Sequence, residues 1–290
     1  MRRFALATAL TSLLAATGAT QEAVTVRPPT DAKAGQKLRV SEAETSKTAM
    51  DFVAAGEKMV NSEENTRSVV YVQEVVTAAG KGGGQPLKLK RTYEKYEATD
   101  DGKPAPGPPL DTPIVIEKGK EKYTFDAGGK KIAVAFLKKL DDEFNAPGKD
   151  GDPVPDFLPP KPVKAGDTWK LPAKRMFSTL EGGDDGPKLD LDKVTSGGKV
   201  LKVYRKGGER FVVLEMSFAA PMLSLGKDGP KISDASMSAK LTTDFCADRA
   251  VPTSTTTSST KMTATFDDPL IKGTFRFEQT TTTTEELVKE

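Results

Sequence analysis

Long runs of β-branched residues, separated by glycine, constrain the fold of this chain more than any other feature. The segment Thr66–Thr77 is rich in valine and threonine, which favour extended strands. Between Met262 and Phe266 apolar residues alternate with threonine, as expected for a strand with one apolar and one polar face. Gly207-Gly208 between two such runs predicts a hairpin. Further strands are expected at Lys37–Phe52, Leu87–Thr99, Ile114–Ile116, Lys122–Phe125, Lys199–Tyr204, Phe211–Phe218, Ser236–Cys246, Pro252–Phe266 and Thr274–Leu287.

Helical patterns are few. Ile132–Phe144 has apolar residues at helical spacing with charged residues opposite them, which predicts a helix. Lys174–Leu180 is a candidate for a second, short helix, and Glu42–Val53 fits either a helix or the favoured strand. The sequence therefore predicts a mainly β fold of antiparallel meander sheets with one or two short helices. The strands form either two similar lobes or a curved half-barrel.

The first 19 residues have the pattern of an export signal. Arg2 and Arg3 precede an apolar run from Phe4 to Ala16, and the small residues that end at Ala19 suit cleavage before Thr20. A run of about 13 apolar residues is short for a spanning helix, which needs about 20. We therefore expect a signal peptide at 1–19, an exported periplasmic or extracellular protein, and no transmembrane segment in the mature chain.

The remaining chain divides by composition. Residues 20–34 are polar and contain two adjacent prolines, which indicates an exposed lead-in. Residues 35–145 form a first predicted β lobe that includes helix 132–144. A proline-rich connector follows at 146–162, and a second β lobe occupies 163–290.

The net charge of the chain and the types of side chain that it contains exclude several functional classes. The chain has 43 basic and 41 acidic residues, and residues 1–19 hold two of the basic ones, so the mature chain is neutral. A neutral chain lacks the field that attracts nucleic acid. Histidine is absent, which excludes Ser-His-Asp and Cys-His catalysis and most zinc or copper sites. The single cysteine, Cys246, lies in an apolar strand pattern and is expected to be buried and inert, with intermolecular pairing or a reactive thiol as alternatives.

Motifs that resemble catalytic or binding patterns are weak. Ser196 and Lys199 match a serine–lysine pattern, but two glycines lie between them and predict a hairpin turn instead of a helix. The glycine run 80–84 lacks the Lys-Ser/Thr ending of a phosphate loop. Paired acids remain the best candidates for calcium binding or glycoside hydrolysis, although loop acids more often serve as turn formers. These acids are Asp150, Asp152 and Asp156 in one loop, and Asp184, Asp185, Asp190 and Asp192 in another.

The segment Leu158–Trp169 contains Lys-Pro-Val-Lys-Ala-Gly-Asp-Thr-Trp. Together with Lys33–Phe52 and the threonine-rich C-terminal strands, it resembles an uncharacterised family of exported, β-rich bacterial proteins that carry a domain of unknown function. The resemblance implies a β-rich scaffold with similar halves, and it implies no catalytic residues. Trp169 within this segment is expected to anchor the core.

These features favour a non-catalytic function. We expect an exported binding module or envelope structural component with an unknown ligand or envelope partner, and no cofactor, catalytic residue or metal ligand is assigned from the sequence. The alternative is a hydrolase that works through carboxylates, either glycosidase-like or calcium-assisted.

Overall fold

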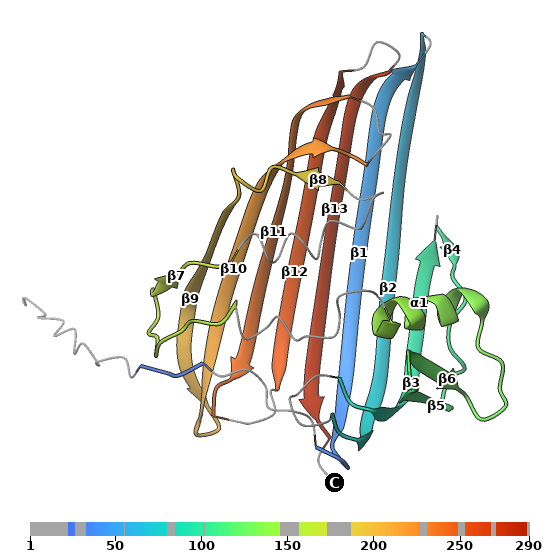
Figure 1. Cartoon of the computed structure of the whole chain (residues 1–290), viewed down its shortest axis with the longest axis vertical. Helices are drawn as coiled ribbons and strands as arrows, with labels where there is room; N and C mark the ends of the chain where they lie inside the picture. Colours follow the sequence, from blue (N-terminus) through green and yellow to red (C-terminus); the bar gives the residue numbers. More distant parts are fainter. Residues whose placement is uncertain are drawn as a thin grey trace, which may run out of the picture.

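The computed structural model describes residues 23–26, 33–54, 56–79, 85–100, 102–145, 157–172, 187–226, 231–248, 253–267 and 271–288. Within them the chain forms thirteen strands and one helix (Figure 1). In the N-terminal half these are β1 (Lys37–Ala54), β2 (Glu57–Thr77), β3 (Lys88–Asp100), β4 (Lys103–Pro104), β5 (Pro113–Lys118), β6 (Tyr123–Asp126) and α1 (Val134–Asn145). In the C-terminal half they are β7 (Thr168–Trp169), β8 (Lys188–Leu189), β9 (Thr195–Lys206), β10 (Glu209–Ser224), β11 (Ile232–Cys246), β12 (Ser254–Asp267) and β13 (Ile271–Leu287).

All strands belong to one antiparallel sheet that does not close on itself. The order is β6-β5-β3-β2-β1-β13-β12-β11-β10-β9-β7, with β4 paired to β3 and β8 paired to β10. The first long strand and the last therefore lie side by side in the middle of the sheet, where β1 pairs with β13 from Leu38–Leu287 to Ala54–Ile271. The prediction of a mainly antiparallel β fold with a short helix is confirmed. Strands from 35–145 form one half of this sheet and strands from 163–290 form the other (Figure 1).

Local sequence accounts for the hairpins. The segment left open between helix and strand, Glu42–Val53, is part of strand β1. Gly56, with φ +85°, separates β1 from β2, and Gly207 and Gly208, with φ +61° and +86°, separate β9 from β10. These left-handed conformations carry little penalty for glycine, which has no β-carbon. Strand β2 begins at Glu57, well before the predicted Thr66, because its polar first half pairs residue by residue with β1.

The strand register defines two faces. Residues directly opposite each other in antiparallel strands point to the same side of a sheet. One such row crosses the sheet through Trp169, Gly198, Met216, Leu241, Ser258, Thr281, Glu44 and Arg67. We call the face that carries this row the inner face. In Figure 1, α1 and β8 lie in front of the sheet, and both pack on this inner face.

In the described part of the chain the hydrophobic core consists of three clusters on the inner face. One lies under α1, where Phe136, Leu140 and Phe144 are buried against strands β2, β3, β5 and β6. A second contains Leu171 and Leu189 over β10 to β12. The third contains residues of the N-terminal segment, the chain before β7, and strands β9 to β11: Val24, Val26, Val163, Val200, Val212, Leu214 and Phe245.

The N-terminal segment differs from the exposed lead-in expected at 20–34. Val24 is 1% exposed and forms a β-bridge with Val163, and Val26 is 6% exposed. Their apolar side chains cover the end of β9 and β10, which the sequence pattern around them gives no reason to expect. Both residues therefore belong to the core.

The threonine tracts form strand faces, as predicted. Thr256 donates to Thr243 at 3.2 Å, and Thr257 and Thr282 share a hydrogen bond of 3.3 Å. Hydroxyl pairs of this kind stabilise neighbouring strands modestly. They make the middle of the sheet polar on both faces.

Candidate functional site

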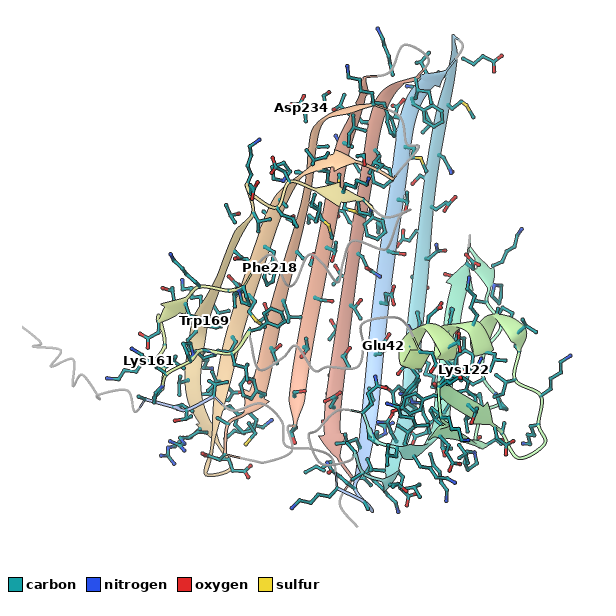
Figure 2. All side chains as sticks on the ribbon, in the orientation of Figure 1. Glu42, Lys122, Lys161, Trp169, Phe218 and Asp234 are labelled. Atoms are coloured by element: carbon teal, nitrogen blue, oxygen red, sulfur yellow. The ribbon has the colours of Figure 1, made fainter. Side chains whose placement is uncertain are left out.

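A groove lies between α1 and the inner face of β1 to β3, with a volume of about 710 Å³. We call it the helix–sheet groove. It is within the size range of small-molecule sites. Figure 2 shows Glu42 of β1 beside α1, whereas Trp169 and Phe218 lie toward β9 and β10. The side chains of the groove that carry charge or aromatic rings are Glu42, Glu44, Arg67, Tyr71, Arg91, Tyr93, Asp100, Phe136, Lys139, Asp142 and Glu143.

Arg91 of β3 is the buried centre of the groove wall, only 4% exposed. Its guanidinium donates to both carboxylate oxygens of Glu143 on α1, at 2.8 and 2.9 Å. It also donates to Gln73 Oε1 at 2.8 and 3.2 Å and to the Tyr93 hydroxyl at 3.2 Å. Its carbon Cζ lies 4.3 Å from the centre of the Tyr71 ring. Arg91 therefore fixes α1 on the sheet, and its hydrogen-bonding capacity is used within the protein.

Arg67 of β2 forms ion pairs with two carboxylates of β1. Its Nη1 lies 3.0 Å from Glu42 Oε1 and 3.7 Å from Glu44 Oε2. Glu44 Oε1 also accepts a 2.6 Å hydrogen bond from Gln279 of β13. Burial raises the pKa of Glu42, Arg67 opposes this, and the negative charges of Glu44 and Glu143 raise it further. One cation thus faces two carboxylates that are 18% and 23% exposed.

Tyr71 of β2 is a partly buried residue of the groove wall. Its ring packs against Tyr93 and Arg91, while its hydroxyl has no hydrogen-bond partner within the described part of the chain. Burial raises the pKa of this hydroxyl well above its usual value, so it stays protonated. Among the described residues that line the groove, the buried side-chain atom without a hydrogen-bond partner is Arg67 Nε, which is a donor.

The acids singled out in the sequence do not meet in this groove. Asp150, Asp152, Asp156, Asp184 and Asp185 lie outside the described residues, as do the glycine run 80–84 and the predicted short helix 174–180. Asp190 and Asp192 are described and belong to a turn between β8 and β9.

Asp190 is paired locally within that turn. It forms an ion pair with Lys193 at 2.9 Å, and this hydrogen bond lowers its pKa. Among the described residues no three acids or thiols are placed to hold a metal ion.

The serine–lysine pair does not converge. Ser196 and Lys199 lie within strand β9, not in the turn expected from the intervening glycines. The register puts Ser196 opposite Phe218 and Lys199 opposite Glu215, on opposite faces of the sheet. Ser196 Oγ donates to the carbonyl of Leu171 at 3.1 Å. This geometry gives the serine a structural role.

Cys246 and Trp169 are placed largely as predicted. Cys246 is 2% exposed at the end of β11. Trp169 is partly buried, contacts two of the apolar clusters, and donates from Nε1 to the carbonyl of Phe157 at 2.9 Å. In the described part of the chain no helix has the length and apolar character to span a bilayer.

Comparison with known proteins yields little. No family model matches the chain, and no curated protein matches it. A structure called "lipid-protein interactions in lipovitellin" is similar over 88% of this chain and 25% of that chain, with 10% identity and a TM-score of 0.35. The chain thus spans about a quarter of that protein. A likeness at this level carries no functional argument.

Proposed function

We propose that the protein is an exported, non-catalytic binding module whose ligand occupies the helix–sheet groove. The groove itself carries this proposal, because its volume of about 710 Å³ suits a small molecule and Arg67, which lines it, has a buried Nε donor without a hydrogen-bond partner in the described part of the chain. The groove is preformed, since Arg91 and Glu143 attach α1 to the sheet through two hydrogen bonds. Preformed walls reduce the entropy lost on binding.

The absence of histidine from the sequence supports a non-catalytic role. The described nucleophile candidates, Ser196 and Cys246, lie away from the groove lining, and Cys246 is buried. An envelope structural component remains a second form of the same non-catalytic proposal. It would use the long sheet as a scaffold and leave the groove empty.

A carboxylate-dependent hydrolase is the alternative, and one observation favours it. Glu42 has a raised pKa and Glu44 lies two residues away on the same face. Two carboxyl groups with different proton affinities are the requirement for paired acid and base catalysis. Arg67 bridges these groups, however, which suits an ion pair better than proton transfer.

Two experiments test these proposals. Protein purified natively from its source is analysed by native mass spectrometry, and hydrogen exchange is compared before and after removal of any bound molecule. A bound molecule that protects α1 and β1 to β3 supports the binding module. Turnover of glycoside or ester substrates, with or without calcium, that disappears in Glu42→Gln would support the hydrolase instead.

Export rests on the N-terminal segment. Cleavage after Ala19 would leave Val24 in place to pair with Val163. The exported form should therefore begin at Thr20 or within a few residues of it, as measured by intact mass. An exported form that retains Met1 would contradict the signal-peptide proposal.

A further inference from the structure

We propose that two copies of the protein form a symmetric dimer by pairing strand β2 with its own copy along an edge that no described strand occupies. The proposal goes beyond the ligand of the helix–sheet groove and does not depend on it. Strand β1 pairs with β2 from Glu57 to Glu74, whereas β3 pairs with β2 only from Arg67 to Thr77. We call residues 57–65 the free edge of β2. In Figure 1 this part of β2 borders the sheet above β3 and β4.

The backbone of the free edge points hydrogen-bonding groups away from β1. Val75 N–H donates to the carbonyl of Gln36, on the β1 side, at 2.9 Å, and Thr66 N–H donates to Thr99 Oγ1, on the β3 side, at 3.0 Å. Backbone groups of successive residues point to alternate sides of a strand, and the register between β1 and β2 has no shift. The even-numbered residues from 58 to 64 therefore direct their N–H and C=O groups to the free edge, which is a template for another strand.

The side chains of the free edge are exposed and include two large apolar ones. Met59 is 51% exposed and Val60 is 68% exposed. Lys58 and Glu64 have opposite charges and lie at equal distances in the sequence on either side of Asn61. Charges on an edge strand usually oppose pairing, but this arrangement is complementary to its own antiparallel copy.

The length of the free edge selects one register for the pair. The edge ends at Thr66, where Thr99 of β3 takes up the backbone N–H. Two copies that use the whole edge are therefore centred on Asn61, which lies on the two-fold axis. In this register Lys58 lies opposite the partner's Glu64, and both are among the residues whose backbone groups face the edge. Opposite charges directly across antiparallel strands stabilise the pairing.

Other registers fit less well. A shift of two residues in one direction places Glu57 opposite the partner's Glu63, and like charges in that position are destabilising. A shift in the other direction brings the partner against Thr66, whose N–H is already bonded to Thr99. The register derived from the length of the edge is thus also the one that its charges favour.

The ion pairs that Lys58 and Glu64 form within one protomer leave both side chains accessible. Lys58 lies 3.4 Å from Asp51 and Glu64 lies 3.1 Å from Lys47, and all four side chains are more than half exposed. Lys47 is opposite Glu64 on the outer face. The partner's Lys58 would extend this pair into a row of alternating charges across the dimer.

Pairing in this register would bring each protomer to the groove of the other. Asn65 and Thr66 line the helix–sheet groove. The partner's Glu57 would lie opposite Asn65, and odd-numbered residues of β2 face the inner side, as Arg67 does. The hairpin between β1 and β2 of one protomer would therefore border the groove of its partner.

The first test is sedimentation velocity of the full mature chain at about 1–200 µM. An interface made by one strand from each protomer is small, so we expect a reversible dimer that forms as the concentration rises. Hydrogen exchange at the same concentrations should show protection of β2 between residues 58 and 64 in the dimer.

A cysteine cross-link tests the register. In antiparallel pairs of the type that Asn61 would form with its copy, Cα atoms lie about 4.5 Å apart, within the range that a disulfide spans. Asn61→Cys should therefore give a covalent dimer on mild oxidation. Glu63→Cys is the matched control on the same face, because its copy would lie roughly 14 Å away, and it should cross-link at least about 10-fold more slowly. Cys246 is 2% exposed and does not compete.

Two further variants act on the edge itself. Ser62→Pro removes an N–H that faces the free edge and leaves the bonds between β1 and β2 in place, so it should abolish the dimer, whereas Ser62→Ala should retain it. Lys58→Glu should weaken association about 2- to 30-fold, and adding Glu64→Lys should restore it. Circular dichroism establishes that each variant is folded.

A chain that stays monomeric at every concentration overturns the proposal. So does a dimer that persists in folded Ser62→Pro, because it would form through another surface. Equal cross-linking of Asn61→Cys and Glu63→Cys would overturn the register, and this comparison decides the matter if Ser62→Pro does not fold. None of these results depends on a ligand in the groove, so the failure of this proposal leaves the proposed function standing.

Discussion

The indole ring of Trp169 lies against Gly198, in the space that a β-carbon at position 198 would occupy. The two residues pair across β7 and β9. The same ring contacts two apolar clusters of the inner face. Position 198 therefore requires glycine, because a side chain there would overlap the indole ring. Trp169 in turn connects the segment before β8 to the sheet.

Gly198→Ala should lower the free energy of unfolding by about 1–3 kcal/mol, because the indole ring has to move to admit the methyl group. Urea unfolding followed by tryptophan fluorescence measures this. Gly197→Ala is the matched control, since a β-carbon there meets only the carbonyl of Trp169 at 4.0 Å. The control should be neutral or slightly stabilising. Equal losses in both variants would show that the indole contact does not limit residue 198.

The pair formed by Arg91 and Glu143 gives a second prediction. Glu143→Ala leaves a guanidinium that is 4% exposed without its carboxylate. Removing one partner of a fully buried pair costs roughly 3–5 kcal/mol, and since the Glu143 side chain is 44% exposed we expect about 2 kcal/mol. Chemical unfolding should show this loss in Glu143→Ala and almost none in Lys138→Ala, an exposed position on the same helix. A loss in both variants would indicate a general effect on α1.

Burial of Cys246 predicts that its thiol does not react in the folded protein. The side chain is 2% exposed, packed at the end of β11 opposite Phe211. Ellman's reagent should label it at the rate of global unfolding, and within seconds in denaturant. Labelling of the native protein as fast as that of the denatured chain would place the thiol at the surface. It would also restore the reactive alternative.

Local patterns predicted most of the fold, because strand and helix periodicity is a short-range property. Arg91 alternates with Leu89 and Tyr93 in the sequence, and all three share the inner face of β3. An arginine within an otherwise apolar strand face was the available signal for the groove. Its partner Glu143 lies 52 residues away, so the pairing depends on how α1 packs and could not be deduced.

Other contacts depend on which distant strands pair, and the local sequence does not reveal that pairing. Glu44 and Gln279 are separated by 235 residues and meet only because β1 pairs with β13. The first half of β2 lacks alternating apolar residues, so only its pairing with β1 reveals a strand there. The burial of Val24 likewise depends on Val163, which lies on a remote segment.

Glu285 of β13 lies on the inner face, opposite Val40 of β1 and Ser254 of β12. Burial raises the pKa of its carboxyl, and the hydrogen bond with Ser254 opposes this shift. The ionised form is therefore less favourable in the folded state than in the unfolded state, where the pKa is near 4.5. This penalty is present above the folded pKa, diminishes as the pH falls through it, and is absent below about 4.5.

Glu285→Gln removes this penalty, since a glutamine does not ionise. The variant should be more stable than the wild type at pH 7, and its advantage should decrease as the pH is lowered and reach a minimum near pH 4. Urea unfolding of both proteins at the two pH values measures the difference, in which the contributions of all other groups cancel. Glu286→Gln, at the exposed neighbouring position on the outer face, is the matched control for the substitution itself. An advantage for Glu285→Gln that grows toward low pH would mean that the folded protein favours the ionised carboxylate, which is the opposite of the effect that burial produces.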